Sequence, residues 1–452
     1  MILKNQKLAL SCTRLGAELE GVCEHEGQAV FVPGALPGET VEAQAVKVQP
    51  RYAFAKLLHV KAPSPERAEP ACPVYGTCGG CSGQHMQYAA TLAAKRQQVL
   101  DCMRRIGGFA LTEEDVPPVL GAENPLRSRN KMALPVGGTV QEPQLGFYRK
   151  RSHHIVPLTD CPVAMGDVRG VIAAVLQWMK EARVPPYDEE TGGGLLRHVV
   201  VRMSRGGGLM VLLVATRAAL PEVAQLIQLL KDDVQGFCAL HVSVNAARGN
   251  VILGKTSEAL YGEAALTETL LGLSFEISPL SFFQVNPAQT ERLYRCAVEL
   301  AELGKADVVV DAYAGAGTIA LCMAQKAARV IGIEIVPQAV DAACTAAEKM
   351  GAQNARFMLS DAGEAARQLV QEGIAPDIIT VDPPRKGCDA ATLEAILTMK
   401  PGRLVMVSCN PATLARDLGT LAAGGYEICE VQPVDMFPRT HHVETVVYLK
   451  RS

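Results

Sequence analysis

The sequence predicts a multidomain chain: a small β-barrel, a central α+β domain, and a C-terminal α/β domain with a Rossmann-like, doubly wound sheet. The chain has 452 residues, whereas single cores rarely grow beyond roughly 250–300 residues. Short alternating strands broken by turns fill the N-terminal region, and strands separated by helices fill the C-terminal region. We place the domains at residues 1–62, 63–275 and 276–452.

Composition indicates an ordinary globular protein of the cytoplasm. The chain is 48% hydrophobic and 20% charged, as is usual for globular proteins. Its first residues lack the apolar core of a signal peptide, and no stretch approaches about 18 apolar residues, so we expect no membrane attachment. In the cytoplasm the 14 cysteines stay reduced and are core residues, metal ligands or nucleophiles. No obligate protein partner is evident, and we expect a monomer.

The N-terminal domain is predicted from β-type alternation punctuated by Pro-Gly turns. Strands are expected near residues 21–23, 28–32, 40–48 and 53–60. A linker at 63–67 leads into a cysteine-rich segment. The apolar spacing over 88–106 then predicts an amphipathic helix that could pack on the C-terminal domain.

The central domain combines strand-like runs at 198–202 and 209–214 with helices near 167–183 and 220–232. The net charge of the chain is −3, but the stretches 127–151 and 195–217 are rich in arginine and lysine and nearly free of acids. Because local fields can differ from the overall charge, a nucleic-acid partner is not excluded.

The C-terminal domain is predicted from strands and helices that alternate. Strands are expected at 308–311, 330–334, 355–359, 377–382 and 403–408, helices at 287–303, 317–327, 337–350, 390–399 and 411–422, and a closing hairpin ends at 443–449. This alternation is typical of parallel βαβ units.

Chemically active residues stand where strands of this domain end. A glycine turn at 315–317 follows the first strand, Glu334 ends the second, Asp382 ends the fourth, and Cys409 follows the strand at 403–408. In an open parallel sheet these ends face one crevice. An acid at the position of Glu334 holds ribose hydroxyls, and a thiol beside a nucleotide-type cofactor suggests covalent catalysis. A cysteine taken alone is more often buried and inert.

The motifs around these residues resemble those of a known family. With Tyr313 before its first glycine and Ala320 in place of a third, the turn resembles motif I of class I S-adenosylmethionine-dependent methyltransferases. Four ordered motifs resemble the signatures of RNA 5-methyluridine methyltransferases: Phe282-Phe283-Gln284-Val285-Asn286, Asp382-Pro383-Pro384-Arg385-Lys386-Gly387, Ser408-Cys409-Asn410-Pro411 and His442-Val443-Glu444-Thr445. The N-terminal barrel is similar to a TRAM domain, so the resemblance covers nearly the whole chain.

The resemblance implies S-adenosylmethionine as the methyl donor. The residues that match its binding positions are Gln284, Tyr313, Glu334 and Asp382. Phe282 matches a position that stacks on the target base. Asp361 matches one that commonly contacts adenine, although a solvated aspartate would fit there equally well.

The chemistry of uracil methylation gives two residues distinct roles. Uracil C5 is too poor a nucleophile to accept a methyl group until a thiolate has added at C6, and Cys409 is the candidate thiolate. The C5 proton must then be removed before the cysteine can leave, and Glu444 is the candidate base. Amino methyltransferases place an aromatic residue after Asp-Pro-Pro, whereas this chain has Arg385, which favours carbon methylation.

A second group of cysteines is expected to hold metal. Cys72, Cys78 and Cys81 lie in a glycine-rich loop, and Cys161, which precedes a proline, is the candidate fourth ligand. Spacing alone leaves a zinc site with four cysteines open. The resemblance implies a [4Fe-4S] cluster, as in the ribosomal-RNA branch of the family, and we expect it to be structural. Radical S-adenosylmethionine enzymes use Cys-x3-Cys-x2-Cys, which this spacing does not match.

The leading hypothesis is C5 methylation of uridine in 23S ribosomal RNA, with the basic stretches at 127–151 and 195–217 holding the RNA and the target base extruded into the pocket. Transfer-RNA members of the family generally lack the barrel and the cluster, yet the same reaction on transfer RNA remains an alternative. A non-catalytic RNA-binding iron-sulfur protein is another, and it would need neither Cys409 nor Glu444.

Overall fold

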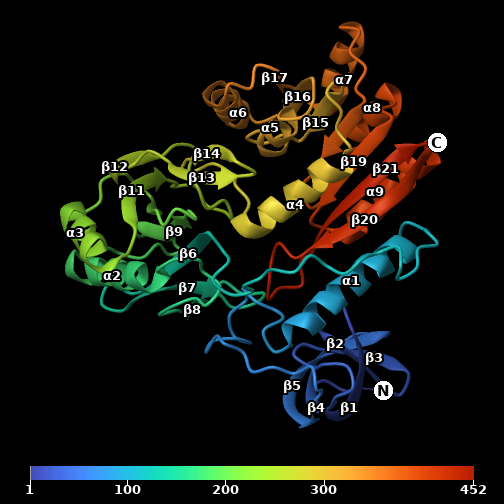
Figure 1. Cartoon of the computed structure of the whole chain (residues 1–452). Helices are drawn as coiled ribbons and strands as arrows, with labels where there is room; N and C mark the ends of the chain where they lie inside the picture. The colour runs from blue at the N-terminus through green and yellow to red at the C-terminus, as the bar shows by residue number, and fades with distance from the viewer. Residues whose placement is uncertain (1) are drawn as a thin grey trace.

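The computed structural model describes residues 2–452, and its N-terminal part is a closed barrel of five strands in the order β1-β2-β3-β5-β4 (Figure 1). The strands are β1 (Lys7–Leu15), β2 (Gly21–His25), β3 (Gln28–Val32), β4 (Thr40–Val48) and β5 (Tyr52–Ala62). Because the diameter of a barrel grows with its number of strands, this interior is narrow, and it is filled in part by Ala43, Ala45 and Ala53. The strand β1 was not predicted, although Leu8 and Leu10 alternate inward as in a half-buried strand.

The helix α1 (Tyr88–Arg105) links the barrel to the C-terminal domain, where it packs against α9 (Pro411–Ala423) and β20 (Tyr426–Val434). Its Lys95 is fully buried and forms an ion pair with Asp435, while Tyr88 donates a hydrogen bond of 2.6 Å to the other carboxylate oxygen. Burial lowers the pKa of Lys95 and Asp435 opposes that shift. Since an unpaired buried charge is strongly destabilising, this pair fixes α1 against the segment after β20.

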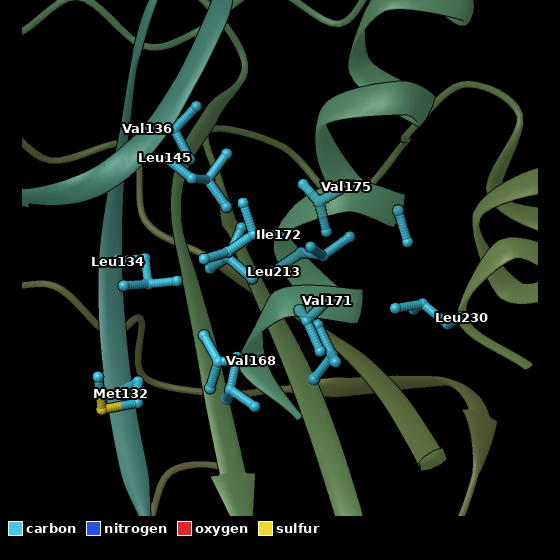
Figure 2. Packing of buried hydrophobic residues seen from close by; sticks show 14 of the residues in the cluster. Met132, Leu134, Val136, Leu145, Val168, Val171, Ile172, Val175, Leu213 and Leu230 are labelled. Atoms are coloured by element: carbon cyan, nitrogen blue, oxygen red, sulfur yellow. The ribbon is translucent and has the colours of Figure 1, made fainter. Parts of the chain in front are cut away.

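The central part is a seven-stranded sheet in the order β12-β11-β10-β9-β6-β7-β8. Its strands are β6 (Lys131–Gly138), β7 (Pro143–Tyr148), β8 (Ile155–Pro157), β9 (Leu196–Met203), β10 (Leu209–Ala215), β11 (Phe237–Val244) and β12 (Glu258–Gly262). The helices α2 (Val168–Glu181) and α3 (Val223–Asp233) cover it. Figure 2 shows Ile172 and Val175 of α2 in the same apolar core as Leu134 of β6 and Leu213 of β10.

The C-terminal domain is built on a second seven-stranded sheet, in the order β17-β16-β15-β18-β19-β21-β20. After the hairpin β13 (Leu266–Leu270) and β14 (Leu273–Ile277), its elements are α4 (Pro287–Leu300), β15 (Val308–Ala312), α5 (Thr318–Ala324), β16 (Arg329–Glu334), α6 (Pro337–Met350), β17 (Ala355–Leu359), α7 (Ala362–Gln371), β18 (Ile378–Val381), α8 (Ala390–Met399), β19 (Arg403–Ser408) and β21 (Glu444–Arg451). Strands β15 to β19 are parallel and β21 is antiparallel to both neighbours. The strand order reverses between β15 and β18, where ligands bind in such sheets.

The helix α7 was not predicted. Asp361 begins it as the N-cap and accepts a hydrogen bond of 2.9 Å from the backbone of Glu364, as such a residue commonly does. Its amphipathic pattern is carried by only Ala365, Ala366 and Leu369, which is a weak signal in ten residues. None of the helices within residues 2–452 is long and apolar enough to span a membrane.

Two of the four arginines in the basic stretch at 195–217 are not available to an RNA-binding surface, whereas Arg205 and Arg217 are exposed. Arg197 and Arg202 are only 3% exposed. Arg197 donates to the backbone carbonyl oxygens of Asn245 and Ala247, at 2.7 Å each, and Arg202 donates to those of Pro279 and Ser281. Their charges therefore organise loops inside the protein, and Arg202 supports the segment that leads to Phe282.

Candidate active site

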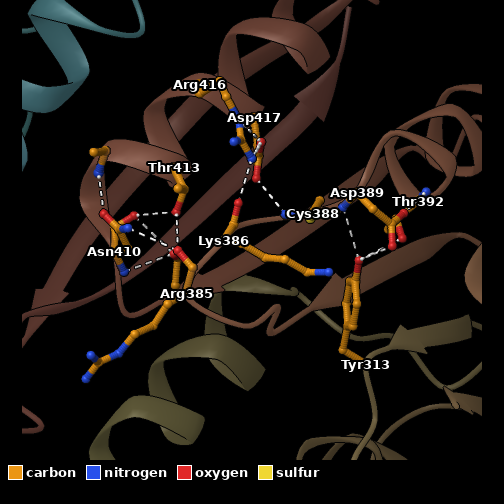
Figure 3. Close-up of polar contacts among 12 residues, drawn as sticks. Tyr313, Arg385, Lys386, Cys388, Asp389, Thr392, Asn410, Thr413, Arg416 and Asp417 are labelled. Carbon is orange, nitrogen blue, oxygen red and sulfur yellow. Dashed lines mark hydrogen bonds and ion pairs between the residues drawn. The ribbon is translucent and has the colours of Figure 1, made fainter.

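Cys409 lies in the tight turn between β19 and α9. Asn410 is the N-cap of α9 and accepts a hydrogen bond of 3.1 Å from the backbone of Ala412, while Pro411 occupies the first turn, where its missing N–H leaves nothing unsatisfied. The Asn410 side chain also donates to the carbonyl oxygen of Arg385 at 3.0 Å (Figure 3). The turn is thus tied to the loop after β18, and the half-buried thiol is held at the carboxyl edge of the sheet.

Glu444 reaches the same edge from the neighbouring antiparallel strand. In the antiparallel register of β19 and β21, Ser408 lies opposite Thr445. Cys409, which follows Ser408, and Glu444, which precedes Thr445, are therefore neighbours at the strand ends. Glu444 is buried, and its Oε2 has no hydrogen-bond partner in the described part of the chain. Burying a carboxylate oxygen without a hydrogen-bond partner destabilises the fold. Such unsatisfied groups are often found at functional sites.

The edge also collects two further carboxylates. Asp382 follows β18, and Asp311 on β15 is buried and accepts a hydrogen bond of 2.7 Å from Thr380. Burial raises the pKa of each to about 7, with Glu334 adding to the shift of Asp311 and Asp311 adding to that of Asp382. Asp311 was not predicted as a site residue, although it stands at the head of the glycine turn, at the end of a strand that lines the crevice.

This environment also controls the protonation of the candidate nucleophile and base. Burial raises the pKa of Cys409 to about 11, and the charges of Glu444 and Asp382 add to the shift. Burial and the charge of Asp382 raise the pKa of Glu444 well above its usual range. Arg385 opposes both shifts. The Cys409 thiol therefore holds its proton near neutral pH, and Glu444 binds a proton more readily than an ordinary glutamate.

Removing the charge of Arg385 should shift the pH dependence of methyl transfer. Because Arg385 lowers the pKa of both Cys409 and Glu444, Arg385→Gln is expected to shift the rising limb of kcat/KM against pH to higher pH. The activity below that limb should fall by about tenfold for each pH unit of displacement. The pH profile measures this. Lys386→Gln is the matched control, because the two side chains point in different directions in Figure 3; equal displacement by both variants would contradict the assignment.

The expected cofactor residues lie around the glycine turn. Tyr313, in a left-handed conformation with φ of 70°, forms a hydrogen bond of 2.8 Å with Thr392 (Figure 3). Glu334 accepts backbone hydrogen bonds from Gly315 at 3.0 Å and from Ile335 and Val336 at 2.9 Å each. The acid is thus fixed beside the turn, and a carboxylate has further lone pairs for hydroxyl groups.

The segment from Phe282 to Asn286 closes the site toward the central domain. Phe282 is 74% exposed, whereas Gln284 is buried. Asn130 donates from its side chain to the carbonyl oxygen of Gln284 at 3.2 Å, and Asn286 caps α4 and donates to the carbonyl oxygen of Met436. An aromatic ring so exposed contributes little to the core, which leaves it available for a ligand.

The four cysteines Cys72, Cys78, Cys81 and Cys161 line one cavity between the cysteine-rich loop and the central domain. Burial raises the pKa of Cys161 to about 11, and charges on the other three cysteines would add to that shift, as expected for neighbouring thiols. Within residues 2–452, no group of three or more such side chains converges in a way that could hold a metal ion. Neither an iron-sulfur cluster nor zinc is therefore established.

The order of the strands, the glycine turn after β15 and the carboxylates at the strand ends define a class I methyltransferase domain. In this chain a TRAM barrel precedes it. Residues 265–452 match the family described as tRNA (Uracil-5-)-methyltransferase, and residues 5–58 match the TRAM domain. An RNA methyltransferase of Clostridium tetani is 42% identical over 449 residues, which cover 99% of this chain and 97% of the relative. One of Listeria innocua is 43% identical over 452 residues, covering 99% and 98%. The chain belongs to the RNA uracil-5-methyltransferase family, and S-adenosylmethionine is its cofactor.

A solved structure shares this architecture throughout. The tRNA (uracil-54, C5)-methyltransferase of Pyrococcus abyssi, in complex with S-adenosyl-L-homocysteine, is 26% identical, with a TM-score of 0.78, and the match covers 98% of this chain and 100% of that one. So complete a match includes the barrel. The barrel by itself therefore does not distinguish ribosomal-RNA members from transfer-RNA members of the family.

Proposed function

We propose that this RNA uracil-5-methyltransferase acts on a uridine of 23S ribosomal RNA, with Cys409 as nucleophile and Glu444 as general base. The observation that carries the assignment of roles is the register of β19 and β21, which brings the two strand ends together. In this arrangement a thiol and a carboxylate can address neighbouring carbon atoms of one flat base.

A residue can then be assigned to each step of the proposed reaction. The Cys409 thiol gives its proton to solvent, the resulting thiolate bonds to C6 of uracil, and the electron pair of the C5–C6 double bond makes C5 nucleophilic. S-adenosylmethionine, when bound, supplies a methyl group on a sulfonium that C5 can attack. Glu444 takes the remaining C5 proton, the C5–C6 double bond forms again, and the C6–S bond breaks. The product is 5-methyluridine, and the cysteine is released for another turnover.

The surrounding residues would position the two substrates. Gln284, Tyr313, Glu334 and Asp382 are proposed to hold the cofactor, and the exposed ring of Phe282 is proposed to stack on the extruded base. Asp361 is engaged as the N-cap of α7, so we assign it no contact with adenine.

Two RNA targets can be separated directly. The cysteine set, which resembles that of the ribosomal-RNA branch, supports ribosomal RNA, whereas the Pyrococcus abyssi enzyme supports transfer RNA as the second candidate. Equal amounts of unmodified 23S ribosomal RNA and transfer RNA should be incubated with the enzyme and labelled S-adenosylmethionine. We expect 5-methyluridine in the ribosomal RNA. Label confined to the transfer RNA would overturn this choice of target and leave the chemistry standing.

The cysteine cavity is proposed to hold a [4Fe-4S] cluster through Cys72, Cys78, Cys81 and Cys161. The proposal rests on the identity of the donors and not on their present geometry: four thiols line one cavity, and four cysteine thiolates are the ligands of such a cluster. Its contribution would be structural, since it would tie the cysteine-rich loop to the central domain.

Anaerobically purified protein is expected to contain about four iron and four sulfide ions per chain, measured by colorimetric assay. Cys161→Ser should lose most of this iron and lower the melting temperature. Cys238→Ser, which changes a central-domain thiol outside the cavity, is the matched control. Bound zinc without sulfide would identify a zinc site instead.

A further inference from the structure

Three aromatic side chains form a cluster on the outer face of the barrel. Phe31 on β3 lies beside Phe54 on β5, with ring centroids 5.3 Å apart, and Tyr52 lies 5.8 Å from Phe54. Neighbouring residues on the same strands, such as Val30 and Ala53, are buried in the barrel, so the three rings point away from its core. Tyr52 is 38% exposed. Rings outside the core do not stabilise the barrel by filling it, and exposed aromatic clusters commonly mark binding surfaces.

Positive charge surrounds these rings. The Arg151 guanidinium lies 5.5 Å from the centroid of the Phe54 ring. Lys47 on β4 is opposite Phe54 in the register of β4 and β5, and Arg51 directly precedes Tyr52; both are exposed. An exposed acid, Glu24, stands farther along the face, across β3 from β5. The balance of charge thus favours an anionic partner that carries flat groups.

The same surface adjoins the active site through the loop at 149–154. Lys150 in this loop forms an ion pair of 2.6 Å with Glu18 of the barrel. Burial lowers the pKa of His441, Glu18 opposes that shift and Lys150 adds to it, which places both charges near His441. The His441 and His442 rings are 4.0 Å apart, and His442 lies 3.4 Å from the Arg385 guanidinium. Aromatic rings, imidazole rings and cationic side chains therefore form a continuous series from Arg385 at the active site to Phe54 on the barrel.

We propose that Phe31, Tyr52 and Phe54 form a stacking platform for unpaired nucleotides that flank the target uridine, with Lys47, Arg51 and Arg151 contacting their phosphates. This inference rests on the proposed function only in taking RNA as the substrate. Every base has an aromatic face that can stack on such rings, but a base within a duplex does not expose it. The platform therefore selects single-stranded RNA without selecting its sequence.

The test compares Tyr52→Ala with Tyr52→Phe in the full-length protein. The probe is a fluorescein-labelled RNA single strand of about twelve nucleotides, within the usual span of such surfaces, and its Kd is measured by fluorescence anisotropy. Tyr52→Ala is expected to weaken binding at least about fivefold without changing the salt dependence, because it removes stacking and no charge. Tyr52→Phe should bind as the parent protein does. Arg151→Ala should weaken binding and reduce the salt slope by about one.

Three outcomes would overturn the platform: unchanged binding by Tyr52→Ala, equally tight binding of a duplex of the same length, or ultraviolet crosslinks from the single strand that avoid strand β5. Leu3→Ala, which removes another exposed apolar side chain outside the cluster, controls for general effects, and thermal melting checks folding. Methyl transfer by the parent protein is scored separately. Its absence would refute the proposed function, whereas normal transfer combined with unchanged Tyr52→Ala binding would refute the platform alone.

Discussion

Replacing Cys409 with alanine is expected to reduce methyl transfer to RNA by at least about 10³-fold, because alanine cannot add to C6 and so cannot make C5 nucleophilic. The loss should appear in kcat more than in the binding of RNA, since the thiol forms its bond only during the reaction. Initial rates of transfer from labelled S-adenosylmethionine measure kcat, and anisotropy measures RNA affinity.

Cys344→Ala is the matched control, because Cys344 is an exposed thiol on α6 in the same domain. It should retain the parent rate. If Cys409→Ala also transfers methyl groups at the parent rate, covalent catalysis by this residue is refuted. If its melting temperature falls sharply, Cys409→Ser offers a second variant with nearly the same volume.

Replacing Glu444 with glutamine is expected to arrest the reaction after methyl transfer. Glutamine preserves the shape of the side chain but cannot accept the C5 proton, so the C6–S bond to Cys409 should persist. Turnover should fall by about 10²-fold or more, and a covalent protein–RNA complex should appear on denaturing gels. The complex should be absent from the Cys409→Ala, Glu444→Gln double variant.

Glu430→Gln serves as the comparison, because Glu430 is an exposed carboxylate on the adjacent strand β20. It should turn over normally and form no stable complex. Full turnover by Glu444→Gln, without any trapped RNA, would mean that another group removes the proton. Asp382, the other carboxylate whose charge acts on Cys409, would then be the first residue to test.

Several parts of the site could be predicted because their signals are local. An apolar run, Leu404 to Val407, that leads through Ser408 and Cys409 to Asn410-Pro411 predicts a strand that turns abruptly into a capped helix, which is how Cys409 is presented. The alternation of strands and helices likewise predicts that the glycines after β15 and the acid at the end of β16 lie at the same edge of the sheet. The location of charged side chains could not be predicted in this way. Arg197 and Arg202 were interpreted as part of a surface, yet they are buried against backbone carbonyls. No local pattern distinguishes a solvated arginine from one that a distant loop encloses.

The sequence by itself determined which residues stand at the strand ends and which chemical groups the chain brings to them. Only the tertiary structure decided how these groups meet. The last strand, β21, inserts antiparallel between β19 and β20, and its register with β19 makes Glu444 a neighbour of Cys409. Strand pairing between distant segments depends on the packing of the whole sheet. Burial then raises the pKa of both groups and of Asp382, because desolvation is a property of the assembled site and not of any residue type.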